Sequence, residues 1–98
     1  MQKTKNEFEK LITSYFTTEV KSIQDSNKDY FYINISPDNN DSFLIKTAIP
    51  IKAVENYSKA TGAQKDNFNA KLEKLIKSHI KNFSGNTESW PVNFDITY

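Results

Sequence analysis

The sequence contains no cysteine, no arginine, only 2 glycines and a single histidine among its 98 residues. Without cysteine the chain can form no disulfide and offers no thiolate for metal binding or nucleophilic catalysis. All 13 basic side chains are therefore lysines, which cannot make the bidentate contacts that guanidinium groups make with phosphates and carboxylates. Because the two glycines lie far apart, at positions 62 and 85, no glycine-rich phosphate-binding loop is expected.

The sequence also lacks long apolar runs and a strong charge of either sign. No segment approaches the length that a membrane span requires, and residues 1–10 are too highly charged to resemble a secretory signal. The formal net charge is +1, from 13 basic and 12 acidic residues, so the chain has no overall field that would attract nucleic acid or membranes. These features predict a cytoplasmic protein that has no membrane partner.

Aromatic residues are plentiful, with 7 Phe, 5 Tyr and 1 Trp. Their apolar area can offset the conformational entropy that is lost on folding, so the composition favours a folded chain over a disordered one. The length suits one domain and is too short for two independent cores. We therefore expect residues 1–98 to form a single domain.

The first half of the chain changes from helical to alternating periodicity. Residues 4–24 predict an amphipathic helix, with Thr4 and Glu7 as a capping box. Its apolar stripe consists of Phe8, Leu11, Ile12, Tyr15, Phe16, Val20 and Ile23. Residues 29–36 and 42–49 then alternate apolar and polar side chains, which predicts two strands. The turn-forming residues 37–41 between them indicate an antiparallel hairpin.

The second half predicts two helices and a final strand. Residues 51–60 form the first helix, which Gly62 ends, and residues 64–83 form the second, with Gly85 as a left-handed cap. A single helix kinked near Gly62 is the alternative for this region. Residues 90–98 alternate again and predict a strand. Because Pro91 lacks an amide hydrogen, it should stand at the start of this strand or on a sheet edge.

The resulting order is α-β-β-α-α-β. Each strand has one apolar face and each long helix one apolar stripe, so the simplest fold is a two-layer α+β domain with the helices on one face of a three-stranded sheet. The other face of the sheet would then be open to solvent. The side chains expected on this open face are Tyr30, Tyr32, Asn34, Leu44, Lys46, Ala48, Asn93, Asp95 and Thr97.

The sequence offers no catalytic constellation, and we predict that the protein is not an enzyme. His79 lies on or beside the apolar stripe of its helix, which is typical of a histidine at the edge of a core. One histidine without a carboxylate four residues on does not make a metal site. Residues 38–41 superficially resemble a calcium loop, but Phe43 and Ile49 stand where that loop needs glycine and glutamate. No cofactor is expected.

Binding to another protein is the function that remains. Tyrosine is enriched at the centres of protein interfaces, so we predict a protein-binding site at Tyr30, Tyr32 and Lys46 on the open sheet face. Inhibitors, immunity proteins or antitoxins, and phage accessory factors are small domains that act in this way. A homodimer could form through the same face or through the C-terminal edge strand.

Nucleic-acid binding is the alternative function. Lys71, Lys74 and Lys77 recur along the solvent side of the helix predicted at residues 64–83, where a row of lysines could contact phosphates. Residues 50–98 carry 7 Lys against 5 acidic side chains, which is a slight surplus. Glu73 stands among these lysines, and this is equally typical of an ordinary solvated helix face.

Overall fold

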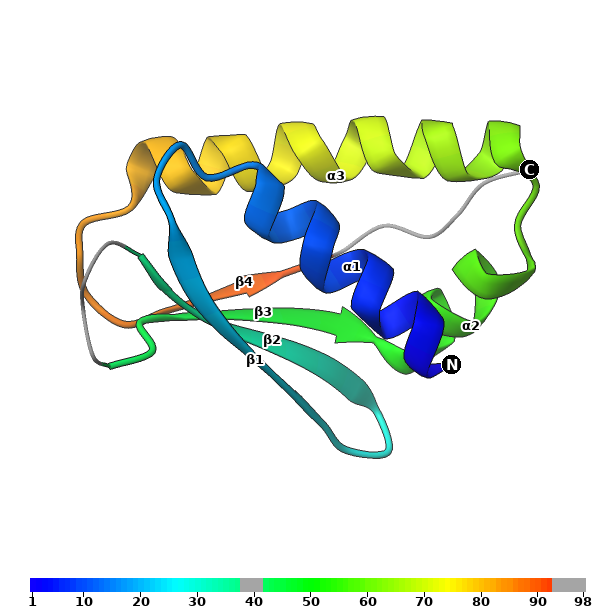
Figure 1. Ribbon diagram of the computed structural model, residues 1–98, viewed down its shortest axis with the longest axis horizontal. Coiled ribbons are helices and arrows are strands. Elements are labelled where there is room, and N and C mark those ends of the chain that lie inside the picture. The colour runs from blue at the N-terminus through cyan, green and yellow to red at the C-terminus, as the bar shows by residue number, and fades with distance from the viewer. Residues whose placement is uncertain (38–41, 93–98) are drawn as a thin grey trace.

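The computed structural model describes residues 1–37 and 42–92, and it contains three helices and four strands in these ranges (Figure 1). The helices are α1 (Gln2–Ser14), α2 (Ile51–Lys59) and α3 (Gly62–Asn82). The strands are β1 (Val20–Ser26), β2 (Tyr30–Pro37), β3 (Ile45–Pro50) and β4 (Glu88–Pro91). The chain is therefore an α+β protein, as the sequence predicted.

The four strands form one mixed sheet in the order β1-β2-β3-β4. The first three run antiparallel to their neighbours, and β4 pairs parallel with β3 after the chain has passed through α2 and α3. Figure 1 shows α1 and α3 lying over one face of the sheet, while α2 packs near the start of α1 at one end. The core lies between this helical layer and the sheet.

The predicted three-stranded sheet and the order α-β-β-α-α-β are wrong, because β1 occupies part of the segment predicted as the first helix. That helix ends at Ser14 instead of near residue 24, and β1 pairs with β2 along its whole length. The predicted capping box of Thr4 and Glu7 is also wrong. The helix begins at Gln2 and Thr4 is buried inside it, so this side chain packs in the core instead of capping the helix.

The alternation predicted for β2 and β3 is confirmed. Phe31, Ile33 and Ile35 of β2, together with Ile45, Thr47 and Ile49 of β3, are buried on the inner face of the sheet. The antiparallel pairing of these strands is confirmed as well. Phe43 was expected on the same buried face, but it precedes β3 and is 39% exposed. Of the turn predicted at residues 37–41, positions 38–41 lie outside the described residues.

Residues 51–83 form two helices instead of one kinked helix. Ala60 and Thr61 have extended backbones that separate α2 from α3. Thr61 and Gln64 make a reciprocal capping box, which satisfies backbone N–H groups at the start of α3. Gly62 is thus the first residue of α3, and its prediction as the end of α2 is wrong. Gly85 does adopt the predicted left-handed conformation, with φ of +86°, but the C-cap of α3 is Phe83, whose backbone is extended.

The last predicted strand is partly confirmed. Strand β4 begins two residues earlier than expected, at Glu88, and Trp90 and Val92 are buried as the alternation predicted. Since β4 is an edge strand of the described sheet, Pro91 stands where a missing N–H is tolerated. Residues 93–98, which completed the prediction, lie outside the described residues.

Tyr15 follows α1, and its partly buried hydroxyl makes the stability of the fold depend on pH above neutrality. Its hydroxyl donates a hydrogen bond to the carbonyl of Asn69 on α3, over 3.4 Å. Burial, with a smaller effect of the Glu73 carboxylate, raises the pKa of Tyr15 from 10.0 to about 12. The unfolded chain therefore loses this proton first, so the stability that neutral Tyr15 contributes is complete below pH 10 and is lost as the pH rises toward 12.

We expect the free energy of unfolding to fall more steeply in the wild type than in Tyr15→Phe between about pH 9 and pH 11. Urea denaturation followed by circular dichroism at both pH values measures this difference. The two proteins differ in no other titratable group, so the comparison isolates Tyr15. Equal pH dependence in the two proteins would show that the hydroxyl ionises as easily in the folded chain as in the unfolded one.

Candidate functional site

The face of the sheet that looks away from α1 and α3, here called the outer face, is covered by none of the described helices (Figure 1). Because side chains alternate along a strand, every second residue of each strand lies on it. The outer face contains Lys21, Ile23 and Asp25 of β1, Tyr30, Tyr32 and Asn34 of β2, Lys46 and Ala48 of β3, and Ser89 and Pro91 of β4.

The structure brings together the three residues predicted to bind a protein. The rings of Tyr30 and Tyr32 stack with centroids 6.0 Å apart. The Nζ of Lys46, on the neighbouring strand, lies 4.9 Å from the centroid of the Tyr32 ring, a cation–π distance. The Asn27 amide donates a 3.3 Å hydrogen bond to the Tyr32 hydroxyl. Tyr30 is 42% exposed and Tyr32 half-buried, so the group presents an ordered aromatic and cationic surface to solvent.

Only some of the other residues predicted on the open face lie on the outer face of the sheet. Asn34 and Ala48 lie on it, next to Lys46 and Tyr32 in the register. Leu44 precedes the first residue of β3 and is half-buried. Asn93, Asp95 and Thr97 lie outside the described residues.

Ile23 belongs to the outer face, although its spacing from the preceding apolar residues predicted a place in the apolar stripe of a helix. It pairs with Asn34 of β2, is 54% exposed, and lies between Lys21 and Asp25 on the outer face of β1.

 Among the large apolar side chains of the described ranges, none is more exposed than Ile23. The sequence signal that could have indicated this strand is its β-branched residues, with Thr17 and Thr18 just before β1 and Val20 and Ile23 within it.

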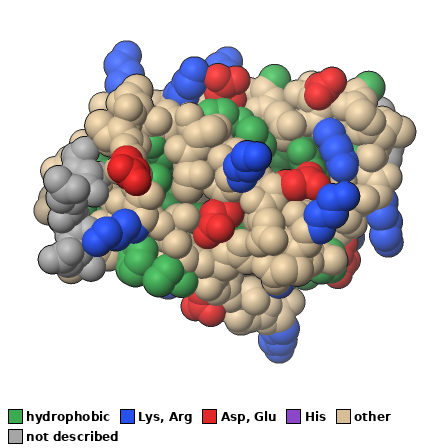
Figure 2. Space-filling model, viewed as in Figure 1, with side chains coloured by type: hydrophobic (Ala, Val, Ile, Leu, Met, Phe, Trp, Pro, Cys, Tyr) green, Lys and Arg blue, Asp and Glu red, His purple; other side chains and the backbone are tan. Residues whose placement is uncertain are grey.

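The three lysines predicted to contact nucleic acid lie on α3, in the helical layer and not on the outer face. Lys77 forms a 2.8 Å ion pair with Glu73, and Lys71 and Lys74 line a shallow hollow with Leu75. Figure 2 shows basic and acidic side chains interspersed on the side of the molecule that it displays. The lysine row and the tyrosine pair therefore belong to different surfaces.

His79 occupies the core-edge position that the sequence predicted. Its ring stacks on Trp90 with centroids 5.2 Å apart and an interplanar angle of 13°, and it is half-buried. This contact gives His79 a packing role between α3 and β4. Within residues 1–37 and 42–92, no group of three or more His, Cys, Asp or Glu side chains lies close enough to hold a metal ion.

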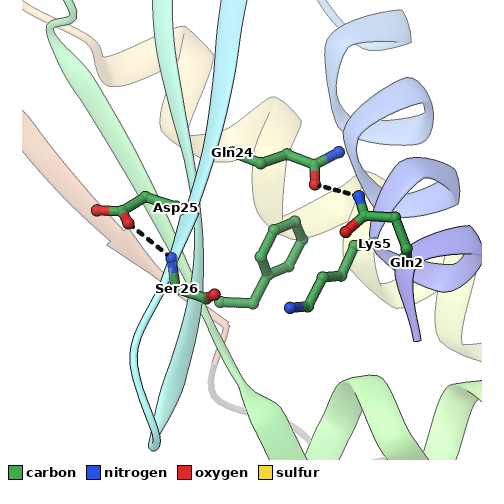
Figure 3. Close-up of a pocket in the computed structure, with 6 residues that line it drawn as sticks. Gln2, Lys5, Gln24, Asp25 and Ser26 are labelled. Carbon is green, nitrogen blue, oxygen red and sulfur yellow. Dashed lines mark hydrogen bonds between the residues drawn. The ribbon is translucent and has the colours of Figure 1, made fainter.

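A small cleft of about 170 Å³ lies between α1 and β1 (Figure 3). The Nε2 of Gln2 donates to the Gln24 side chain over 2.8 Å, and the Nε2 of Gln24 donates to Asn6 over 2.7 Å. Lys5 Nζ lies 5.5 Å from the centroid of the Phe31 ring on the floor of the cleft. These contacts tie the helix to the edge strand, and they bring no acid–base pair together.

Comparisons with protein-family models, with curated proteins and with solved structures find no significant match to this chain. Among the described helices, none combines the length and the apolar character needed to cross a membrane. Its function is therefore inferred from the chemistry of the surfaces of this chain.

Proposed function

We propose that this chain is a non-enzymatic domain that binds another protein through the outer face of its sheet, with Tyr30, Tyr32 and Lys46 at the centre of the contact. The observation that carries the proposal is the stacked tyrosine pair with Lys46 over one ring, on a sheet face that no described helix covers. Inhibitors, immunity proteins or antitoxins, and phage accessory factors fit this description.

The tyrosine pair suits a protein partner for two physical reasons. Each ring offers a large contact area but has few rotatable bonds, so little conformational entropy is lost on binding. The stacking between the rings and the contact with Lys46 already hold Tyr32 in place, which lowers this cost further. The chemistry of the surface favours a partner with apolar side chains to cover the rings and a carboxylate to meet the Lys46 ammonium.

These surfaces are less suited to binding nucleic acid than to binding a protein. A strand stacked on Tyr30 and Tyr32 would lie on the outer face, whereas the lysine row is on α3 in the other layer. One of its three lysines, Lys77, is already paired with Glu73. A ligand that stacks on the tyrosines therefore cannot use the lysine row at the same place.

Replacing both tyrosines in a Tyr30→Ala, Tyr32→Ala variant should weaken partner binding by about thirtyfold or more, the effect typical of residues at the centre of an interface. The domain should still unfold cooperatively, because neither ring belongs to the buried core. The measurement is quantitative mass spectrometry of proteins captured from a native lysate by the wild type and the variant, followed by titration of the captured partner. Thermal unfolding by circular dichroism checks the fold.

The matched control is the Lys71→Glu, Lys74→Glu, Lys77→Glu variant, which changes the other surface and should capture the same partner as the wild type. Fluorescence anisotropy with single-stranded RNA and duplex DNA at roughly 50 and 200 mM salt tests the alternative function. Binding that falls steeply with salt and disappears in the lysine variant would replace the proposal by nucleic-acid binding. Undiminished capture by the tyrosine variant would also contradict the proposal.

A further inference from the structure

Strand β1 is an edge of the described sheet, and its hydrogen bonds show which backbone groups point away from β2. The Asn27 N–H donates to the Tyr30 carbonyl over 2.9 Å, which makes these residues a hydrogen-bonded pair at the end of the hairpin. Pairs alternate along an antiparallel ladder, so Ile23 bonds to β2 through its backbone. The backbone groups of Ser22 and Gln24 consequently point outward, away from the sheet.

The side chains of β1 on the outer face form a self-complementary pattern. Lys21, Ile23 and Asp25 follow one another at every second position, so a basic residue, an apolar residue and an acidic residue stand in line. Figure 3 shows Gln24 directed toward α1, whereas Asp25 points to the other side of the strand. Rotating this line by half a turn about Ile23 exchanges its basic and acidic ends.

We infer that β1 pairs in antiparallel fashion with β1 of a second copy of this chain, about a two-fold axis at Ile23. In this register Lys21 faces Asp25 of the second copy, and Asp25 faces Lys21 of the second copy. Opposite charges at directly facing positions stabilise a strand pair, and like charges destabilise it. The charge pattern of β1 therefore fits another copy of itself.

The backbone groups agree with this register. Ser22 would exchange both of its backbone hydrogen bonds with Gln24 of the second copy, and Gln24 would do so with Ser22, so the outward groups of the two strands meet each other. Ile23 then faces its own copy at a non-hydrogen-bonded position, where side chains approach most closely. Its 54% exposed side chain loses contact with water in this arrangement.

The pairing joins the two sheets edge to edge and leaves Tyr30 and Tyr32 on the outer face. The inference thus goes beyond the proposed function and does not depend on it. Its test needs only the purified protein, so the result is independent of whether any protein partner is captured.

Sedimentation-equilibrium ultracentrifugation over a range of concentrations tests the pairing. We expect the wild type to form dimers, and Lys21→Asp to raise the dimer dissociation constant by about tenfold or more, because both facing pairs become repulsive. Asp25→Lys should have the same effect. The double variant Lys21→Asp, Asp25→Lys restores opposite charges in both pairs and should return the dissociation constant close to that of the wild type.

Mixing the two single variants gives a second test of the register. Lys21→Asp and Asp25→Lys should form a heterodimer with each other although each dimerises poorly alone, because every facing pair then joins opposite charges. Lys81→Asp and Asp66→Lys are matched controls that make the same changes in net charge at exposed positions on α3, and they should leave dimerisation unchanged.

A wild type that stays monomeric at every concentration would overturn the inference. So would a dimer whose dissociation constant is the same in Lys21→Asp as in the wild type, or a double variant that dimerises no better than the single ones. Circular dichroism of each variant verifies that the monomer is folded, and the charge-exchanged double variant keeps the test valid if one single variant is unstable.

Discussion

Replacing Trp90 with alanine is expected to lower the free energy of unfolding by about 3–5 kcal/mol, the loss typical of truncating a buried aromatic side chain. This is a large share of the about 5–15 kcal/mol that stabilises an ordinary domain. Trp90 is 1% exposed, and three aromatic rings surround it. Its ring lies 5.2 Å from His79, 6.1 Å from Phe16 and 6.0 Å from Phe83, measured between centroids.

These contacts explain why one side chain matters so much. They join the short edge strand β4 to α3 and to the segment after α1, and the indole N–H also donates a 3.0 Å hydrogen bond to Glu88. Urea denaturation followed by circular dichroism measures the loss, since the variant lacks the protein's one tryptophan as a fluorophore. Ser89→Ala is the matched control on the same strand, because its exposed side chain should contribute little. Equal stability of the two variants would contradict the packing described for Trp90.

Phe8→Ala should cost a similar amount, about 3–5 kcal/mol. Phe8 of α1 is 1% exposed, and its ring centroid lies 4.8 Å from that of Tyr57 on α2 and 5.7 Å from that of Phe68 on α3. Tyr57 and Phe68 also contact each other, with centroids 5.4 Å apart. The three rings thus hold the three helices together, and removing the first leaves a cavity where they meet.

Leu11→Ala is the matched control for Phe8→Ala, because Leu11 lies on the same helix but is only half-buried against the core. Its truncation should cost distinctly less than that of Phe8. Chemical denaturation of both variants under the same conditions provides the comparison. If Leu11→Ala proved the more damaging change, the three-ring cluster would not be the main junction between the helices.

Much of the fold could be predicted from residue periodicity. The alternation of Phe31, Ile33 and Ile35 predicted the buried face of β2, and the outer positions of Tyr30 and Tyr32 followed from the same pattern. Periodicity is informative here because each side chain of a strand points to one face or the other. The three candidate residues for protein binding could be placed on one surface for this reason.

Strand β1 could not be predicted in this way. Val20 and Ile23 are three residues apart, a spacing that continues the apolar stripe of the preceding helix, so local pattern favoured helix. Their burial in the structure differs, since Val20 is half-buried and Ile23 is 54% exposed. The pairing of β1 with β2 is what places Ile23, Lys21 and Asp25 together on the outer face of the sheet.

The sequence by itself determined the α+β class and the inner and outer faces of β2 and β3, because these depend on periodicities of about 3.6 and of two residues. Only the tertiary structure decided that Val20–Ser26 is a strand, that β4 runs parallel to β3, and that Tyr32 receives Lys46 over its ring. These features depend on backbone hydrogen bonds and ring contacts between segments distant in the chain, and local side-chain patterns do not encode such pairings.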